Sequence, residues 1–185
     1  MHVLTPILLA VFWLAWGYPY VFRAPHNQKR RSLTLAAPTR IGLALECGAI
    51  FLAFFFRLPP QSPPGWERVL PALILGPVAA ILAWTSVAHL GRQFRVHAGL
   101  YEDHRLVSTG PYAVVRHPIY ASLLAVLLVT LLLLTPWKWV PVSLLLFVAG
   151  TEIRVRTEDR LLESRFGEEF RRYKKRVPAY IPFVR

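Results

Sequence analysis

The chain has 185 residues, of which 55% are hydrophobic and 17% are charged, and its 22 Lys and Arg against 10 Asp and Glu give a net charge of +12. So apolar a composition excludes an average soluble domain. The basic residues interrupt long apolar runs and do not coat a soluble fold, so the charge does not indicate a nucleic-acid-binding protein. A single cysteine, Cys47, excludes an internal disulfide.

Five apolar segments determine the predicted fold. A helix needs about 20 apolar residues to cross the hydrocarbon core of a bilayer, with about 17 as the short limit. The segments are 3–22, 41–58, 69–90, 119–135 and 137–153. No Lys or Arg precedes the first segment and no obvious small-residue cleavage site follows it, so we expect a retained membrane helix and not a signal peptide. The prediction is an all-α integral membrane protein with about five transmembrane helices.

The distribution of positive charge predicts the orientation of these helices. Nineteen of the 22 Lys and Arg residues lie in the first and third connections and in the tail, and three lie in the second and fourth connections. The positive-inside rule then places the N-terminus outside and the C-terminus in the cytoplasm. Residues 154–176 keep a helical pattern, so we expect the fifth helix to continue into the cytoplasm until Val177-Pro178 ends it.

Several common sites are missing from the sequence. No G-x-G pair occurs, which excludes a Rossmann phosphate loop and the glycine-rich loops of soluble nucleotide-binding enzymes. The six histidines are scattered, without metal-ligand spacing, and we predict no metal site. A Ser-His-Asp hydrolase is poorly supported too. Any chemistry therefore depends on polar residues at the cytoplasmic ends of the helices.

His117-Pro118 opens the fourth segment, where a proline suits the first helical turn. Arg116 beside it could simply extend to lipid headgroups while His117 caps the helix, and spacing alone favours that structural interpretation.

Arg154 and Glu158 lie one turn apart after the fifth segment. They form either a weak ion pair of about 0.3 kcal/mol or a functional cluster at the mouth of the bundle. Glu46, inside the second segment, either pairs with Arg40 or lines a substrate cavity. We favour the pairing with Arg40, because an unpaired buried carboxylate is costly.

Three motifs occur together around the last two segments. They are Arg116-His117-Pro118-Ile119-Tyr120, then Arg154-x-x-x-Glu158, then Phe166-Gly-Glu-Glu-Phe followed by Lys174-Lys-Arg-Val-Pro. If the two segments form a helical hairpin, the motifs meet on one membrane face. In order and spacing they resemble the isoprenylcysteine carboxyl methyltransferase family, which has relatives among membrane phospholipid methyltransferases. The resemblance covers residues 92–183.

The resemblance implies a site for S-adenosyl-L-methionine and roles for particular residues. Arg154 matches a catalytic, substrate-contacting arginine, and Asp159 stands where the family often has a second acid. His97 lies near the place of a polar contact residue. The implied cofactor-binding residues are His104, Arg105, Leu106, Val107, Tyr112, His117, Pro118, Ile119, Tyr120 and Glu158. Residues 1–90 would form a three-helix region and residues 91–185 the cofactor-binding hairpin, loop and tail of one integrated domain.

The function so predicted is methyl transfer from S-adenosyl-L-methionine to a lipid-like or prenylated acceptor in the membrane, most like carboxyl methylation of isoprenylcysteine. A carboxylate acceptor would be oriented by Arg154 and needs no general base, whereas an amine would need Glu158 or His117 to help remove its proton. Three alternatives stay open: a phospholipid N-methyltransferase, an NADPH-dependent sterol-type reductase with a similar Arg-His-Pro-x-Tyr segment, and a non-enzymatic lipid-binding protein. Membrane lipids are expected partners, nucleic acid is not, and the oligomeric state is left open.

Overall fold

The computed structural model describes residues 4–23, 38–59, 62–91, 94 and 105–182, and within them all regular structure is helical. The helices are α1 (Leu4–Phe22), α2 (Pro38–Phe55), α3 (Trp66–Leu90), the 3-10 turn η2 (Gly110–Ala113), α4 (Pro118–Leu134), the 3-10 turn η3 (Trp137–Trp139), α5 (Val140–Phe166) and α6 (Glu168–Arg176). The predicted all-α fold is confirmed.

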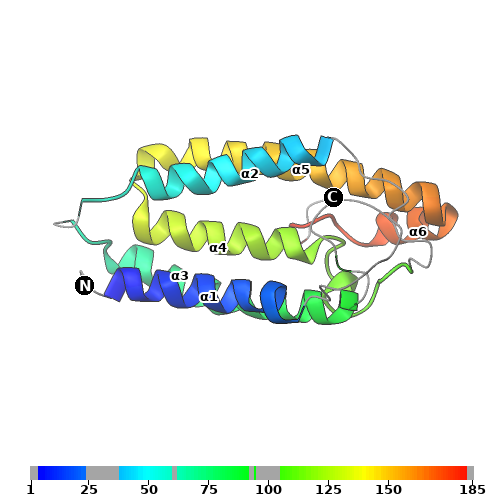
Figure 1. Ribbon diagram of the computed structural model, residues 1–185, viewed down its shortest axis with the longest axis horizontal. Coiled ribbons are helices and arrows are strands. Elements are labelled where there is room, and N and C mark those ends of the chain that lie inside the picture. The colour runs from blue at the N-terminus through cyan, green and yellow to red at the C-terminus, as the bar shows by residue number, and fades with distance from the viewer. Residues whose placement is uncertain (1–3, 24–37, 60–61, 92–93, 95–104, 183–185) are drawn as a thin grey trace.

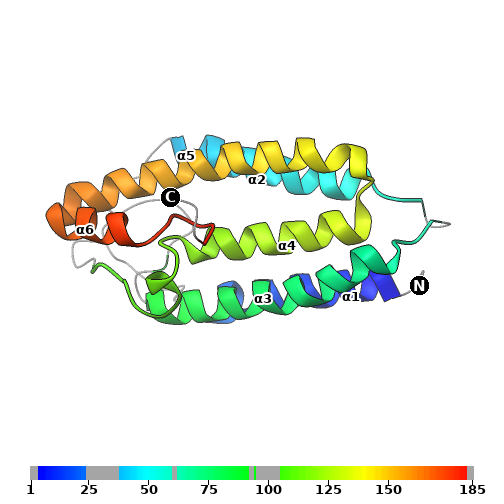
Figure 2. The same ribbon diagram turned by 180° about the vertical axis from the view of Figure 1, so that it is seen from behind.

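The long helices form two pairs, α2 with α5 and α1 with α3, and α4 lies between the pairs (Figures 1 and 2). Helix α2 lies along α5, α3 lies along α4, and α1 packs against both α3 and α4 (Figures 1 and 2). The predicted hairpin of α4 and α5 is present, but α5 packs mainly on α2 and not on its neighbour in sequence. The bundle end that carries Phe22, Pro38 and Pro118 also carries the extension of α5 and α6, and we call it the charged end.

Small and hydroxylated residues bring α2 and α5 close together. A Cβ atom added at Gly150 would lie 2.5 Å from the carbonyl oxygen of Gly42, so the two backbones touch at this point. Further along the pair, the Ser143 hydroxyl donates to the carbonyl of Ala49 at 2.8 Å. Such close approach through small residues is typical of helix packing in membranes.

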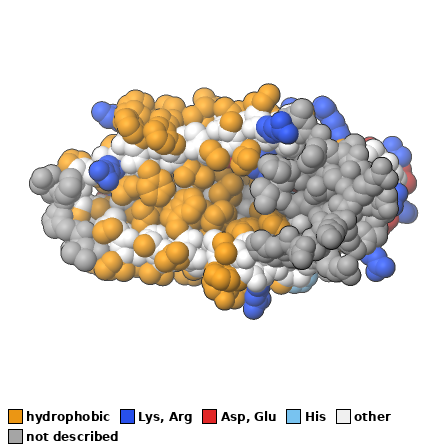
Figure 3. Space-filling view, viewed as in Figure 1, with side chains coloured by type: hydrophobic (Ala, Val, Ile, Leu, Met, Phe, Trp, Pro, Cys, Tyr) orange, Lys and Arg blue, Asp and Glu red, His pale blue; other side chains and the backbone are white. Residues whose placement is uncertain are grey.

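The outer surface of the bundle is apolar. Helices α1, α2 and α3 are each long and apolar enough to cross a membrane, and α4 is a shorter apolar helix of 17 residues. Large apolar side chains point outward, including Leu14, which is 73% exposed, and Leu145, which is 71% exposed. Hydrophobic side chains also gather on the left and middle of the face shown in Figure 3. This surface fits a multi-pass membrane protein.

One prediction about the tail is wrong. The helix of α5 does not continue to Arg176 but ends at Phe166, because Gly167 adopts a positive φ of 51° and its N–H bonds to the Glu163 carbonyl at 2.9 Å. Glycine takes this conformation without steric cost and commonly ends a helix. Helix α6 therefore changes direction and returns towards the bundle (Figure 2), and it ends before Val177-Pro178 as expected.

The chain after α6 is fastened to the segment before α4. The backbone N–H of Arg116 donates to the Pro178 carbonyl and that of His117 donates to the Ala179 carbonyl, both at 2.8 Å. The two sequence motifs are thus joined directly by backbone hydrogen bonds.

Candidate active site

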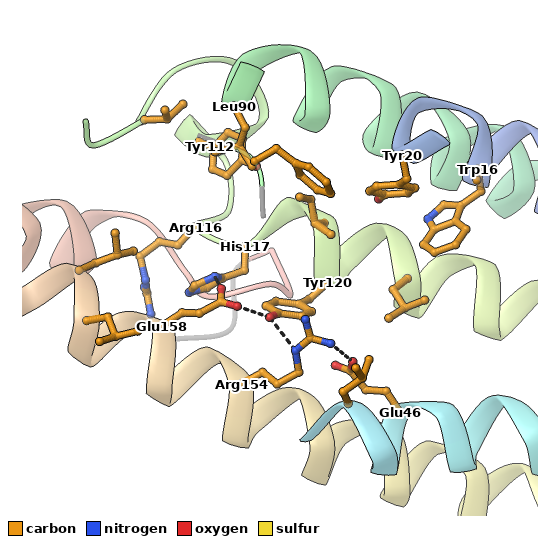
Figure 4. Close-up of a pocket in the computed structure, with 18 of the residues that line it drawn as sticks. Trp16, Tyr20, Glu46, Leu90, Tyr112, Arg116, His117, Tyr120, Arg154 and Glu158 are labelled. Carbon is orange, nitrogen blue, oxygen red and sulfur yellow. Dashed lines mark hydrogen bonds and ion pairs between the residues drawn. The ribbon is translucent and has the colours of Figure 1, made fainter. Parts of the chain in front are cut away.

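A cavity of about 560 Å³ lies at the charged end, between the two helix pairs. Most of the predicted site residues line it: Arg105, Leu106, Val107, Tyr112, His117, Ile119, Tyr120, Arg154 and Glu158. Pro118 is buried in the first turn of α4 and is not one of the lining residues. His97 and His104 lie outside the described residues. Figure 4 shows the polar side chains converging from α2, α4, α5 and the segment before α4.

The innermost polar contact of the cavity joins α5 to α2. Arg154 Nη1 lies 2.7 Å from Glu46 Oε2, and both side chains are buried. The Thr151 hydroxyl donates to the other carboxylate oxygen of Glu46 at 2.9 Å. The expected pairing of Glu46 with Arg40 is therefore wrong. Arg40 precedes Glu46 on the exposed end of α2, whereas the close packing of α5 brings Arg154 to it.

Tyr120 connects this ion pair to the outer part of the site. Arg154 Nε donates to the Tyr120 hydroxyl oxygen at 2.9 Å, and the guanidinium carbon lies 4.9 Å from the centre of the ring. The Tyr120 hydroxyl in turn donates to Glu158 Oε1. Arg154 and Glu158 are therefore both held by α4 (Figure 4), and each faces the same cavity.

His117 lies between two carboxylates. Its Nδ1 is 3.3 Å from Glu158 and its Nε2 is 3.0 Å from Asp159. Burial by itself lowers the pKa of His117, but the hydrogen bonds to Asp159 and Glu158 outweigh it and the pKa is raised above its ordinary 6.5. Both ring nitrogens face a carboxylate oxygen, an arrangement that favours the protonated ring, which can donate from both nitrogens.

Asp159 is the charge that holds the tail against the site. Its Oδ2 lies 3.1 Å from both Arg116 Nη2 and Lys174 Nζ, the latter on α6. Burial raises the pKa of this carboxyl, but the His117 hydrogen bond and the charges of His117 and Arg116 lower it more, to below its ordinary 3.8. Asp159, which stands where the resembling family often has a second acid, is thus a structural carboxylate in contact with three cationic groups.

Tyr112, in η2, offers the cavity a donor that no other described residue uses. Its hydroxyl is buried and has no hydrogen-bond partner among the described residues. Burial raises its pKa well above the ordinary 10.0, so the hydroxyl stays protonated. The Tyr173 hydroxyl of α6 fixes this turn by donating to the Tyr112 carbonyl at 2.5 Å. A buried hydroxyl without a partner among the described residues is available to a bound ligand.

The sequence prediction did not include the apolar wall of the cavity. Its residues from α1 and α2 include Trp13, Trp16, Tyr20, Leu43, Cys47 and Ile50. The spacing of Trp13, Trp16 and Tyr20 puts them on one helix face, which is a recognisable signal, although tryptophans near helix ends are also typical of the membrane interface. Among the described residues, no group of three or more His, Cys, Asp or Glu could hold a metal ion.

An apolar helical bundle with a charged, partly buried cavity at one end defines a multi-pass membrane enzyme. Residues 72–164 match the isoprenylcysteine carboxyl methyltransferase (ICMT) family. Protein-S-isoprenylcysteine O-methyltransferase B of Arabidopsis thaliana is 31% identical over 188 residues, covering 98% of this chain and 93% of the relative. The Schizosaccharomyces pombe protein-S-isoprenylcysteine O-methyltransferase is 36% identical over 57% of this chain and 43% of its own length.

A bacterial relative is also similar. The cobalt-zinc-cadmium resistance protein CzcN of Cupriavidus metallidurans is 34% identical over 52% of this chain and 45% of its own. The chain belongs to the isoprenylcysteine carboxyl methyltransferase family. It is a membrane methyltransferase, as predicted, and the reductase and the non-enzymatic alternatives are set aside.

Proposed function

We propose that the chain transfers the methyl group of S-adenosyl-L-methionine to the carboxylate of a lipid-like acceptor in the membrane, most like a prenylated cysteine. The observation that carries this proposal is the position of Arg154. It lies in one cavity between a polar part, with Glu158, His117 and Tyr112, and an apolar part formed by α1, α2 and α4. A cofactor and an apolar tail can therefore bind on opposite sides of one guanidinium.

The polar part suits the cofactor. The Glu158 side chain is 25% exposed, and a carboxylate there favours a cationic ligand. The unpaired Tyr112 hydroxyl supplies a donor, and Leu106, Val107 and Ile119 supply apolar surface. S-adenosyl-L-methionine supplies a sulfonium-bound methyl group, which forms a bond to an acceptor oxygen as its bond to sulfur breaks, leaving S-adenosylhomocysteine. The cavity volume of about 560 Å³ is in the range of ligand-binding pockets.

The protein contributes position and exclusion of water. Arg154 is held from two sides by Glu46 and Tyr120, so its orientation is fixed before the acceptor binds. A fixed guanidinium can align a carboxylate oxygen with the methyl donor, and the apolar wall keeps water away. A carboxylate at neutral pH is already ionised, so no residue has to accept a proton.

The state of His117 argues against an amine acceptor. An amine must lose a proton, and His117 is the side chain in the cavity best suited to take it. Its contacts with Glu158 and Asp159 raise its pKa and occupy both ring nitrogens, so neither nitrogen is open to the proton of an amine. Glu158 already accepts from Tyr120 and contacts His117, so its carboxylate oxygens are engaged within the protein. This arrangement supports carboxyl methylation over phospholipid N-methylation.

We place the charged end of the bundle in the cytoplasm and the N-terminus outside. The distribution of Lys and Arg supports this orientation. S-adenosyl-L-methionine would then reach the cavity from the cytoplasm and the acceptor from the bilayer. Both halves of the chain line the cavity, which supports one integrated domain made of residues 1–90 and 91–185.

A labelled-methyl assay tests the proposed function. Purified protein in lipid vesicles receives methyl-labelled S-adenosyl-L-methionine and either N-acetyl-S-farnesylcysteine or phosphatidylethanolamine. We expect label in the farnesylcysteine, released as methanol by base because the product is an ester. Leu145→Ala, on the outer face of α5, is the control that keeps activity. Base-stable label in the phospholipid alone would overturn the carboxylate assignment.

A further inference from the structure

The apolar part of the cavity ends partway along three helices. Counting away from the charged end, the last described residues that line it are Trp13 on α1, Ile50 on α2 and Leu123 on α4. One turn further, Leu127 of α4 is fully buried in the packed core. The cavity therefore has a floor, and the largest side chain at that floor is Trp13.

Trp13 is held in place by all three helices. Its indole Nε1 donates to the Thr130 hydroxyl of α4 at 3.0 Å. Its ring lies 6.0 Å from that of Phe54 on α2 and meets Trp16 edge-on at 5.4 Å, measured between ring centres. The ring thus bridges the space between α1 and α2, where the two helix pairs are separated (Figure 3 shows apolar side chains across this space). A fixed indole here closes the cavity.

The distance from Arg154 to this floor is short. Glu46 marks the level of the Arg154 guanidinium, and along α2 Ile50 is about 6 Å and Phe54 about 12 Å further on, at 1.5 Å per residue. An apolar tail whose carboxylate contacts Arg154 therefore meets the Trp13 ring well before a long polyisoprenoid ends. Only the first part of such a tail fits above the indole.

We propose that Trp13 is a specificity-determining residue that selects acceptors by the length of their apolar tail. The proposal rests on the proposed function, because the tail is that of the acceptor held at Arg154. Removing the indole would join the cavity to the space beside Phe54 and Thr130, and longer tails would then gain buried contact that shorter ones cannot reach.

Three acceptors of increasing length test the proposal: N-acetylcysteine thioethers carrying a geranyl, farnesyl or geranylgeranyl group. Calorimetry without the methyl donor gives their Kd values, and the labelled-methyl assay gives kcat/KM. We expect Trp13→Ala to raise the preference for geranylgeranyl over geranyl by at least about fivefold in both measurements. Thr130→Val, which removes the hydroxyl that anchors the indole and also donates to the Val126 carbonyl, should give a smaller change in the same direction.

Trp84→Ala is the matched control. Trp84 also donates through its indole, to the Ala15 carbonyl at 2.8 Å, and stacks on Tyr18, but it is not a lining residue of the cavity. The Trp84→Ala variant should show the same preference for acceptor tail length as the unaltered protein. If Trp13→Ala does not fold, Phe54→Ala takes its place as the test. Phe54 is 40% exposed and its ring lies beside that of Trp13, so its removal must raise the preference for the longer tail. An unchanged preference in folded Trp13→Ala overturns the proposal, whereas failure of the unaltered protein to methylate any of the three overturns the proposed function itself.

Discussion

Arg154 of α5 and Glu46 of α2 form an ion pair with 2.7 Å between Nη1 and Oε2, and neither side chain is more than 9% exposed. The two residues are 108 positions apart in sequence. A buried pair of this kind adds little net stability, but removing one partner leaves a charge without compensation. The pair therefore fixes the arginine that we propose to face the acceptor, and it ties α2 to the site.

We predict non-additive effects when the pair is removed. Glu46→Leu and Arg154→Leu should each lower the free energy of unfolding by about 3–5 kcal/mol, because each leaves a buried charge. The double variant should lose clearly less than the sum of the two losses. Unfolding of the protein in detergent micelles, followed by heat or denaturant, measures this.

The exposed pair Arg171 and Glu168 on α6 is the control for this cycle. Its atoms are 3.0 Å apart, but the side chains are 53% and 64% exposed. Removing either one should change stability by less than about 1 kcal/mol. Strictly additive losses at Glu46 and Arg154 would show that the two charges do not depend on each other.

Activity should depend on the close packing of α2 on α5 at Gly42, because this packing positions Arg154. A Cβ atom there would lie 2.5 Å from Cγ of Arg154 and 2.6 Å from the Gly150 carbonyl oxygen. Gly42→Ala should therefore cost about 1–3 kcal/mol of stability and displace Arg154, with a loss of kcat. Gly48→Ala on the same helix has nothing within 4 Å and should be neutral or slightly stabilising. Equal behaviour of the two variants in unfolding and turnover would contradict this account.

The residues of the site could be predicted from sequence where they form contiguous motifs. His117, Tyr120, Arg154 and Glu158 were named from short patterns, and all four line the cavity. The partner of Glu46 could not be found in this way. Arg40 is close to Glu46 in sequence and was therefore the expected partner. The packing of α2 on α5, which depends on small residues far apart in the chain, brings Arg154 to Glu46 instead.

The course of the tail was predicted only in part for a similar reason. A helical pattern runs through Gly167, and a single glycine inside such a pattern does not by itself end a helix. Ending α5 at Gly167 is favourable because α6 can then turn back. Lys174 of α6 forms an ion pair with Asp159, and the Tyr173 hydroxyl donates to the Tyr112 carbonyl. These are tertiary contacts, which a local pattern does not contain.

Stability should depend on pH through His117. Its pKa is raised from 6.5 in the folded protein, so its stabilising effect is complete below about pH 6.5 and is lost as the pH rises through the raised value. Asp159, with a lowered pKa, contributes fully above about pH 3.8. The Tm deficit of His117→Asn relative to the unaltered protein should thus be largest near pH 5.5 and smaller at pH 9. His89→Asn, at an exposed histidine of α3, should show no such trend, and a deficit that grows with pH would refute the protonated state of His117.

The orientation in the membrane can be tested with single cysteines. In a Cys47→Ser background, Ser164→Cys lies near the end of α5 and Ser62→Cys lies in the connection between α2 and α3, both exposed. In intact cells a membrane-impermeant maleimide should label position 62 and not position 164, because the basic tail is expected in the cytoplasm. Position 164 should react once the membrane is permeabilised. Rapid labelling of position 164 in intact cells would reverse the orientation.

Arg154 and Glu158 should separate acceptor and cofactor binding, although both contact Tyr120. Arg154 lies deeper, beside Glu46, where the reactive head of an acceptor has to be held. Glu158 lies nearer the charged end, beside His117, where the cofactor is expected.

We therefore expect Arg154→Ala to abolish most turnover while the affinity for S-adenosyl-L-methionine, measured by calorimetry, changes by roughly 1 kcal/mol or less. Glu158→Ala and His117→Ala should weaken that affinity clearly, because a charged cofactor in an apolar bundle depends on few polar contacts.

Two further variants sharpen the comparison. Arg154→Lys should restore little activity, because an ammonium does not reproduce the two-pronged contact of a guanidinium with a carboxylate. Arg154→Ala combined with Glu46→Gln removes the stranded charge of Glu46, so recovery of stability without recovery of turnover would locate the defect at the acceptor. Full activity in Arg154→Ala would move the acceptor site elsewhere. Equal loss of cofactor affinity in Arg154→Ala and Glu158→Ala would mean that the two residues, joined through Tyr120, act as one structural unit.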